Sequence, residues 1–477
     1  MRSVCPSLYV HVRNHRASLL IALVVLATGT VSCASDAPSA TEPTAENSAV
    51  PLTSVNDANA IVVTNSVELV AALAPANSGR KILVRSGSYT VTQPLFVPDG
   101  ATLQGEGTML FDASGLPTGF AVGTRTTITM TANVAGDVLT LGNSSSVSGI
   151  AFEDLPGRTG NVIGVNSRDA GDTLSVTITE VEITNPNVHG IVLSGPTACG
   201  VSAVTLNPNL GGNPPPHAGA SISVKMTHSL IHSPSTGIGC GVFAFNFAPL
   251  AIVSVDLSNN VIGGGIIANG GVSRPDAVHD SRTVIQSRRN LYRDDSPNPC
   301  VSRHLGWNMS GGSGVPVMLQ VGETSRNTLR VHSHGDRLEG FTTAILGAGG
   351  RRFFASPTAG PMTDNTMELE LIDATISTPA CGGASFVTDF RLAGALVTNA
   401  SVTPGNGNTL RAVMRNVTGS GTRSNVFADA LGPTGPLSPA IQGTGNRIEI
   451  AGTLRAFEQT NQAIDPAPAA ELFTGGR

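Results

Sequence analysis

The chain has 477 residues, of which 40% are hydrophobic, 13% charged and 4% aromatic, with 55 glycines and 30 prolines. Helical bundles and coiled coils carry far more charge and far less glycine, so these fold classes are excluded. The apolar content excludes general disorder, and a net charge of −5 provides no basic field that would attract nucleic acid. The composition therefore predicts a folded protein without a nucleic-acid partner.

Residues 1–32 have the composition of an export signal. Three arginines precede nine apolar residues, 19–27, and small residues then lead to Cys33. Nine residues rise only about 14 Å as a helix, about half of a bilayer core, so we expect cleavage and not a membrane span. Small residues before a cysteine resemble the lipobox of bacterial lipoproteins, which implies lipidation of Cys33. Thr30 departs from that pattern, and ordinary secretory cleavage is the alternative.

The remaining chain divides into three parts. Residues 33–60 are rich in Ala, Ser, Pro, Thr, Glu and Asn, which predicts a disordered tether. Residues 61–455 form the expected folded domain, and 456–477 form a C-terminal tail. Because no later stretch has eighteen uninterrupted apolar residues, membrane contact is expected only through the N-terminal anchor. We expect an exported protein of the bacterial envelope, lipid-anchored on the periplasmic or outer surface, or secreted.

Four cysteines fall within the expected domain: Cys199, Cys240, Cys300 and Cys381. An even number in an oxidising compartment predicts two disulfides, and three connectivities remain open. A zinc site is the alternative. No pair has the close Cys-x-x-Cys spacing of such sites, so no metal site is expected.

The domain opens with one helix signal and continues with signals for short strands. Asn65, with Glu68 three residues later, predicts a capped helix over 65–73 that ends before Pro75. Short apolar runs separated by glycine-rich turns follow, without crossover helices. This pattern excludes a doubly wound parallel sheet.

A recurring signature indicates how the strands are arranged. Alternating apolar residues lead to a turn-prone polar residue, and further apolar residues follow. The polar residues of the clearest copies are Glu180, His228, Asn259, Asp373 and Asn416, with weaker copies near Arg289 and Ser333. Asn, Asp and His tolerate the left-handed backbone of a sharp corner. Such corners between short strands predict a solenoid with stacked coils and an aliphatic core.

The run from Ile82 to Gly107 resembles the start of right-handed parallel β-helix proteins of the pectate-lyase-like superfamily. It contains Val97-Pro98-Asp99-Gly100 and Gly105-Glu106-Gly107, and the likeness extends to about Leu454. The resemblance implies an all-β, right-handed parallel β-helix in which the helix at 65–73 caps the first coil. It does not select a function, because the superfamily includes lyases, hydrolases, esterases, epimerases and surface proteins without assigned chemistry.

Catalytic motifs of that superfamily are present only as fragments. Asp294 and Asp295 match the paired acids of polygalacturonases, but no Asn-Thr-Asp precedes them. Arg447-Ile448-Glu449 has an acid where that family has lysine. Pectate-lyase-type elimination would need a calcium-binding ladder of acids, so Ca²⁺ is expected only if the lyase alternative holds, and otherwise no cofactor. Asp294 and Asp295 are the catalytic candidates.

The stretch 276–304 has the densest charge in the chain. One hypothesis places a groove here, in which Tyr292 and Trp307 stack on sugar rings while Arg293 and His304 bind hydroxyls or carboxylates. The alternative is a solvated loop held by a disulfide.

A second cluster, His332, His334 and Asp336, alternates along the chain. On an extended strand the three side chains would share one face that could hold a metal. The stronger interpretation is a coil corner whose polar residues face water. The sequence therefore predicts an envelope β-helix protein that binds polysaccharide without established catalysis. A diverged polysaccharide lyase or glycoside hydrolase, and a structural adhesin, are the alternatives. The oligomeric state is left open.

Overall fold

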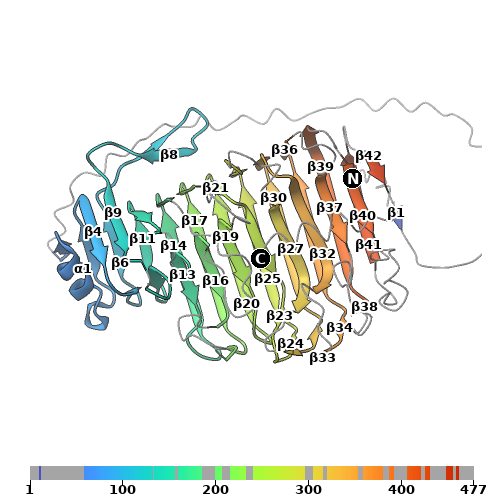
Figure 1. The fold of residues 1–477 in the computed structure, drawn as a ribbon, viewed down its shortest axis with the longest axis horizontal. Coiled ribbons are helices and arrows are strands. Elements are labelled where there is room, and N and C mark those ends of the chain that lie inside the picture. The colour runs from blue at the N-terminus through green and yellow to red at the C-terminus, as the bar shows by residue number, and fades with distance from the viewer. Residues whose placement is uncertain are drawn as a thin grey trace, which may run out of the picture.

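The computed structural model describes residues 10–11, 59–132, 134–155, 160–184, 199–206, 215–232, 240–295, 305–314, 320–352, 358–379, 386–391, 405–420, 425–429, 447–454 and 458–460. These residues form a right-handed parallel β-helix whose strands belong chiefly to three long sheets. Figure 1 shows the coils stacked from the blue N-terminal end to the red C-terminal end. The fold predicted from the sequence is confirmed.

Each coil contributes strands to sheets A, B and C in turn. Sheet A contains β2 (Ile61–Val63), β3 (Lys81–Val84), β6 (Thr102–Gly105), β11 (Ser146–Ser148), β14 (Thr173–Thr179), β17 (Ser221–Thr227), β20 (Ile252–Ser258), β25 (Arg282–Arg288), β30 (Thr328–His334), β35 (Thr366–Ile372), β39 (Thr409–Ser420), β41 (Arg447–Leu454) and, antiparallel to β41, β1 (Val10–His11). Sheet B contains β4 (Gly87–Val91), β9 (Thr126–Met130), β12 (Ala151–Glu153), β15 (Glu182–Thr184), β18 (Leu230–Ile231), β21 (Val261–Gly263), β26 (Leu291–Arg293), β31 (Arg337–Glu339) and β36 (Thr375–Ser377), which pairs with the end of β39.

Sheet C closes the coil. It contains β5 (Leu95–Val97), β10 (Leu139–Leu141), β13 (Ile163–Asn166), β16 (Val201–Val204), β19 (Val242–Phe245), β22 (Ile266–Asn269), β27 (Leu305–Gly314), β32 (Thr343–Arg352), β37 (Phe386–Arg391), β40 (Asn425–Asp429) and β42 (Glu458–Thr460). A short fourth sheet, β24 (Val278–His279), β29 (Thr324–Ser325), β34 (Met362–Thr363) and β38 (Gly405–Asn406), lies between sheets C and A in the later coils.

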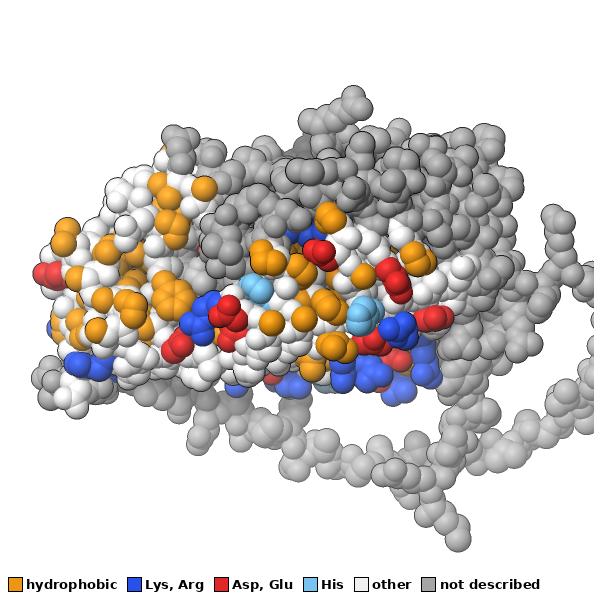
Figure 2. All heavy atoms as spheres, turned by 90° about the horizontal axis from the view of Figure 1, so that it is seen from below, with side chains coloured by type: hydrophobic (Ala, Val, Ile, Leu, Met, Phe, Trp, Pro, Cys, Tyr) orange, Lys and Arg blue, Asp and Glu red, His pale blue; other side chains and the backbone are white. Residues whose placement is uncertain are grey.

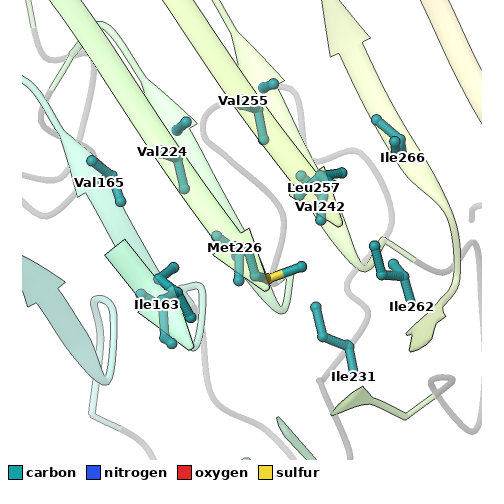
Figure 3. Packing of buried hydrophobic residues seen from close by; sticks show 14 of the residues in the cluster. Ile163, Val165, Val224, Met226, Ile231, Val242, Val255, Leu257, Ile262 and Ile266 are labelled. Atoms are coloured by element: carbon teal, nitrogen blue, oxygen red, sulfur yellow. The ribbon is translucent and has the colours of Figure 1, made fainter. Parts of the chain in front are cut away.

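The core is built from in-register rows of aliphatic side chains. Strands of sheet A alternate buried and partly exposed residues, as β14 does over seven positions. Val176, Val224 and Val255 are register partners on successive coils, and all three are buried. Figure 3 shows Val224 and Val255 on the same side of the coil as the side chains of sheets B and C, among them Ile262 and Ile266. The narrow, layered interior explains why branched residues outnumber aromatic ones.

The predicted corners lie between sheets A and B. Glu180, His228, Asn259, Asp373 and Asn416 all have positive φ values, between 51° and 55°. Of the two weaker copies, Arg289 is also a corner, with φ 54°. The copy near Ser333 is also confirmed: Ser333 is buried within β30, and Gly335, with φ 69°, makes the turn two residues later.

Buried amide ladders follow two sets of corners. At the junction of sheets A and B, Asn260 Nδ2 donates to Asn290 Oδ1 (2.9 Å) and Asn290 Nδ2 donates to Asp336 Oδ1 (3.2 Å). At the junction of the short fourth sheet with sheet A, Asn327 donates to Asn365 and Asn365 to Asn408, each at 3.0 Å. Asn290 Oδ1 also accepts from the backbone N–H of Asn260 on the preceding coil, and Asn260, Asn327 and Asn365 each donate to a backbone carbonyl. The buried polar groups of these turns therefore have hydrogen-bond partners.

The helix α1 (Ser66–Ala72) covers the first coil, as predicted (Figure 1). Asn65 caps it by accepting from Glu68 N at 3.0 Å, while the Glu68 carboxylate bonds back to Thr64. Leu69, Ala72 and Leu73 form its buried face, whereas Val67 is 81% exposed.

A hairpin of β7 (Met109–Phe111) and β8 (Pro117–Phe120) projects from the second coil and lies over sheet B (Figure 1). Its Leu116 packs against Leu230, Val261 and Leu291. Within the described part of the chain, no helix is long and apolar enough to cross a membrane.

Candidate functional site: the outer face of sheet C

Four successive middle strands of sheet C are buried on both faces. Every residue of β13, β16, β19 and β22 is buried. The inward residues belong to the main core, and the outward residues form a separate surface that begins at the first coils. Register partners place one outward row across five successive strands: Phe96, Thr140, Gly164, Ser202 and Phe243. We call these five residues the sheet C row.

The first part of this face is polar. Asp137, which is 1% exposed, accepts from Asn161 N (2.9 Å), Asn161 Nδ2 (3.0 Å) and Asn166 Nδ2 (2.7 Å). Its carboxyl group lies directly over Gly164, where a Cβ atom would be only 1.9 Å from Asp137 Oδ2. Glycine is therefore required at this position for the carboxyl group to rest on the sheet.

Two polar atoms of this face lack a hydrogen-bond partner within the structure. Asn166 Oδ1 and Ser202 Oγ have none, although Asn166 is 3% exposed and Ser202 is fully buried. Burying such an atom without a partner costs about 1–3 kcal/mol. A polar group that supplied hydroxyls to both positions would recover that free energy.

The second part of the face is aromatic. The rings of Phe243 and Phe245 stack with centroids 4.0 Å apart, and Phe247 continues the series at 5.7 Å from Phe245. Arg274 lies over the Phe247 ring at 5.7 Å. Burial lowers the pKa of Arg274, although nearby Asp276 opposes that shift. Flat rings beside hydrogen-bonding groups form the usual lining of a carbohydrate site.

The row is accessible at its first two positions. Phe96 and Thr140 are partly exposed. Arg168 lies 6.0 Å from the Phe96 ring centroid and pairs with Asp99 at 3.2 Å and with Asp172 at 3.5 Å. Partial burial lowers the pKa of Arg168, but its hydrogen bonds and charge pairs with these acids raise the pKa overall. An arginine thus stands over the accessible ring.

A disulfide fixes the margin of this face. Cys199 and Cys240 are bonded, with Cα atoms 4.9 Å apart, and they precede β16 and β19. Cys199 N also donates to Asn161 Oδ1 at 3.1 Å, so the bridge is coupled to the Asp137 network. One of the two predicted disulfides is therefore confirmed. Cys300 and Cys381 lie outside the described residues.

The predicted sugar-stacking role of Tyr292 and Trp307 is wrong. Both side chains point into the core and are fully buried. Their rings pack edge to face at 5.2 Å and 89°, and the Tyr292 hydroxyl bonds with Ser287 Oγ at 2.7 Å. Burial raises the pKa of Tyr292 well above its ordinary value. Successive residues of a strand point to opposite faces, so the residue types of Tyr292 and Trp307 do not show which face they occupy.

The two catalytic candidates lie at the end of β26. Asp294 N donates to Glu339 O at 2.9 Å, and Asp295 forms an ion pair with Arg293 Nε at 2.8 Å. These contacts hold the segment beside β31, and the catalytic role stays a prediction. His304 and the predicted lipidation site, Cys33, lie outside the described residues.

The three residues His332, His334 and Asp336 do not share a face. His332 pairs with Glu370 (3.1 Å) and His334 with Asp373 (3.2 Å) on the outside of sheet A. Asp336 is fully buried in the amide ladder, and burial raises its pKa although Ser and Asn hydrogen bonds oppose that shift. Among the described residues, no group of three or more His, Cys, Asp or Glu side chains could hold a metal ion.

Sequence reasoning missed the sheet C row and the Asp137 network. The signal was present as the pair Gly164 and Asn166, which alternate with apolar Ile163 and Val165. An alternating strand with one face of small and amide residues indicates an outward surface that has a polar neighbour.

Comparison with known proteins gives no family. No family model matches the chain, and no curated protein matches it. Among solved structures, a thermostable pectate lyase, PL 47, is similar over 77% of this chain and 80% of its own, with 10% identity and a TM-score of 0.24. The PL6 family alginate lyase AlyGC covers 84% of this chain and 78% of its own, with 9% identity and a TM-score of 0.18. Similarity at this level carries no information about the reaction.

Proposed function

We propose that the exported part of this chain is a polysaccharide-binding protein of the bacterial envelope, tethered through Cys33, and that glycan binds along the outer face of sheet C. The observation that carries the proposal is the pair of buried polar atoms Asn166 Oδ1 and Ser202 Oγ, which have no hydrogen-bond partner among the described residues, on a face whose Phe96 ring is partly exposed and whose Phe243 ring is buried. Sugar hydroxyls donate and accept hydrogen bonds, and pyranose rings present flat apolar faces to aromatic rings.

The spacing of the row supports a linear polymer. Strands of a sheet lie about 4.8 Å apart, so Phe96 and Phe243, four strand steps apart, are separated by about 19 Å. That length accommodates several sugar units in a chain parallel to the solenoid axis. Thr140 and Phe96 form the accessible end, where the chain would enter.

The decisive variant is Ser202→Ala. Removing a buried hydroxyl that has no partner should leave the stability of the free protein unchanged or raise it, because the desolvation cost disappears. The same change should weaken glycan binding about 2–10-fold, since one hydrogen bond is worth about 0.5–1.5 kcal/mol. Ser223→Ala, at an exposed outward position of β17 in sheet A, is the matched control.

The assay is a glycan panel screened against the unlipidated chain, with affinity and released products both measured. Weaker binding by Ser202→Ala but not by Ser223→Ala supports the proposal. Product release by the wild-type chain would replace simple binding with the lyase or hydrolase alternative, and Asp294→Asn would then be the first variant to test. No glycan binding at all would refute the proposal and favour structural adhesion.

A further inference from the structure

The outer face of sheet A changes character along the solenoid. On β14 and β17 the outward side chains are nearly all small and hydroxylated: Thr173, Ser175, Thr177, Thr179, Ser221, Ser223 and Thr227, with Lys225 as the exception. From β25 onward charged residues appear among the outward positions. This second half is the basic face, and its arginines are Arg282, Arg288, Arg289, Arg330, Arg411 and Arg415.

Three acids of β35 and its corner, Glu368, Glu370 and Asp373, are already paired. Glu368 pairs with Arg330 at 2.6 Å. Glu370 accepts from His332 at 3.1 Å and lies 3.9 Å from Arg415, and Asp373 pairs with His334 at 3.2 Å. The acids therefore neutralise neighbours on β30 and β39 and do not reach β25.

The basic side chains of β25 and its corner are left for another partner. Arg282, Arg288 and Arg289 are exposed, and none forms an ion pair with another residue that the structure describes. Arg282, Arg288 and Arg289 make this part of the face positive, although Asp256 lies beside it on β20 in register with Gln286 and the chain as a whole carries −5. Such a local excess attracts an anionic partner.

Exposed apolar side chains border the basic face. Leu250 is 60% exposed and Ile252 is 44% exposed, and Ile252 is the register partner of Arg282. In the described part of the chain, every other exposed large hydrophobic residue lies between 62 and 122. Figure 2 shows basic and acidic side chains gathered beyond the middle of the molecule, whereas many hydrophobic side chains lie toward the first coils.

We propose that the basic face of sheet A, with Leu250 and Ile252 at its border, docks on an anionic phospholipid surface. Arginine forms paired hydrogen bonds with phosphate oxygens, and leucine and isoleucine partition into the headgroup boundary. The apolar border favours a lipid surface over a soluble polyanion, which would gain nothing from Leu250 or Ile252. A single lipid anchor becomes stable when a basic patch supplies a second signal.

The dimensions of the chain permit this arrangement. A segment of 27 residues, the number between Cys33 and Ile61, can span at most about 90 Å. Seven strand steps separate β2 from β25, which corresponds to about 34 Å along the solenoid. A tethered molecule lying on its side can therefore bring β25 to the membrane that holds Cys33.

The experiment uses the chain with Cys33→Ser, which cannot be lipidated, and vesicles of phosphatidylcholine with 30% phosphatidylglycerol. Each arginine near an anionic surface contributes about fivefold to binding. The double variant Arg288→Gln/Arg289→Gln should bind about 25-fold more weakly. Arg85→Gln/Arg337→Gln removes the same charge from the side of sheet B and should bind as the parent does. Leu250→Ser should weaken binding without changing its salt dependence.

Circular dichroism and melting temperature show that each variant is folded before its binding is compared. Equal loss of binding by both double variants would overturn the proposal, because it would indicate a general charge effect. So would equal binding to pure phosphatidylcholine vesicles. If Arg288→Gln/Arg289→Gln lowers binding to polygalacturonate but not to the vesicles, the partner is a soluble acidic glycan and the lipid proposal is wrong.

Discussion

Replacing Trp307 tests whether this side chain belongs to the core. It is fully buried on β27, in register with Ile266 and Ile345, and its ring meets Tyr292 edge to face at 5.2 Å. Trp307→Ala would leave a large cavity between coils. We expect a loss of about 3–5 kcal/mol of unfolding free energy, the range for large aromatic residues in cores.

The conservative variant Trp307→Phe should lose much less unfolding free energy than Trp307→Ala. Trp307→Phe keeps a ring against Tyr292 and removes an indole N–H that has no hydrogen-bond partner within the structure. The smaller cavity and the lost desolvation cost oppose each other, so we expect a loss of only about 1 kcal/mol. Glycan affinity should be unchanged in this variant, because the ring faces away from the outer surface of sheet C.

Urea unfolding followed by far-ultraviolet circular dichroism measures the stability changes. Fluorescence provides an independent check, because the chain has one tryptophan. Its emission should be typical of an apolar environment and resistant to acrylamide quenching. Emission that shifts on addition of a bound glycan, or Trp307→Ala with wild-type stability, would refute the buried placement.

Four further outcomes are expected. Asn290→Ala breaks the first amide ladder, leaves Asn260 and Leu257 without their partners and should cost about 2–5 kcal/mol in urea unfolding; a cost below 1 kcal/mol would contradict the role of the ladder. Asp336→Asn should stabilise the fold near neutral pH, because burial raises the pKa of Asp336 and the free energy of unfolding of the parent therefore falls as pH rises through that pKa. Urea unfolding from pH 4 to 8 tests this prediction, and a variant whose unfolding free energy falls with pH as the parent's does would contradict it. The hydrogen bond from Arg326, together with that from His279, lowers the pKa of Asp280 to about 2, so the Arg326–Asp280 pair should stabilise the fold above about pH 4 and lose its effect as pH falls toward 2. Arg326→Gln should raise the Asp280 pKa in an NMR titration, and an unchanged pKa would contradict the assignment. Reduction of the Cys199–Cys240 bridge should lower the melting temperature, because a disulfide between residues 41 apart contributes about 4 kcal/mol of stability. Reduction should also weaken glycan binding at the sheet C row, and an unchanged melting temperature and affinity would refute the coupling of the bridge to Asn161.

The architecture was predictable because its signals are local. Each corner needs a residue that tolerates positive φ, and each inward position needs an aliphatic side chain, so both recur visibly along the sequence. Asn259 and Asn416 carry this information within a few residues of context. The weaker copy near Ser333 shows where this information fades: glycine fills a corner as well as asparagine does, so the corner at Gly335 lacks the polar signature that the other copies share.

The candidate site was less predictable because it depends on which face of a strand looks outward. Trp307 and Tyr292 were assigned to a groove from their residue types, which are the same in a core and in a sugar site. Deciding between these places requires the strand register on neighbouring coils. The Asp137 network is harder still, because Asp137, Asn161 and Asn166 meet only after the chain has completed a full coil.

The two buried amide ladders have a consequence for how this molecule tolerates change. Along each ladder the side-chain oxygen of one residue accepts hydrogen bonds from the coil before it, and the amide group of an asparagine donates to the coil after it. A register slip of one residue would leave both groups buried without partners. The ladders therefore keep their hydrogen bonds only when a complete coil is inserted. Segments between the sheets can lengthen freely, whereas growth of the solenoid itself must proceed by complete turns that carry their own asparagine.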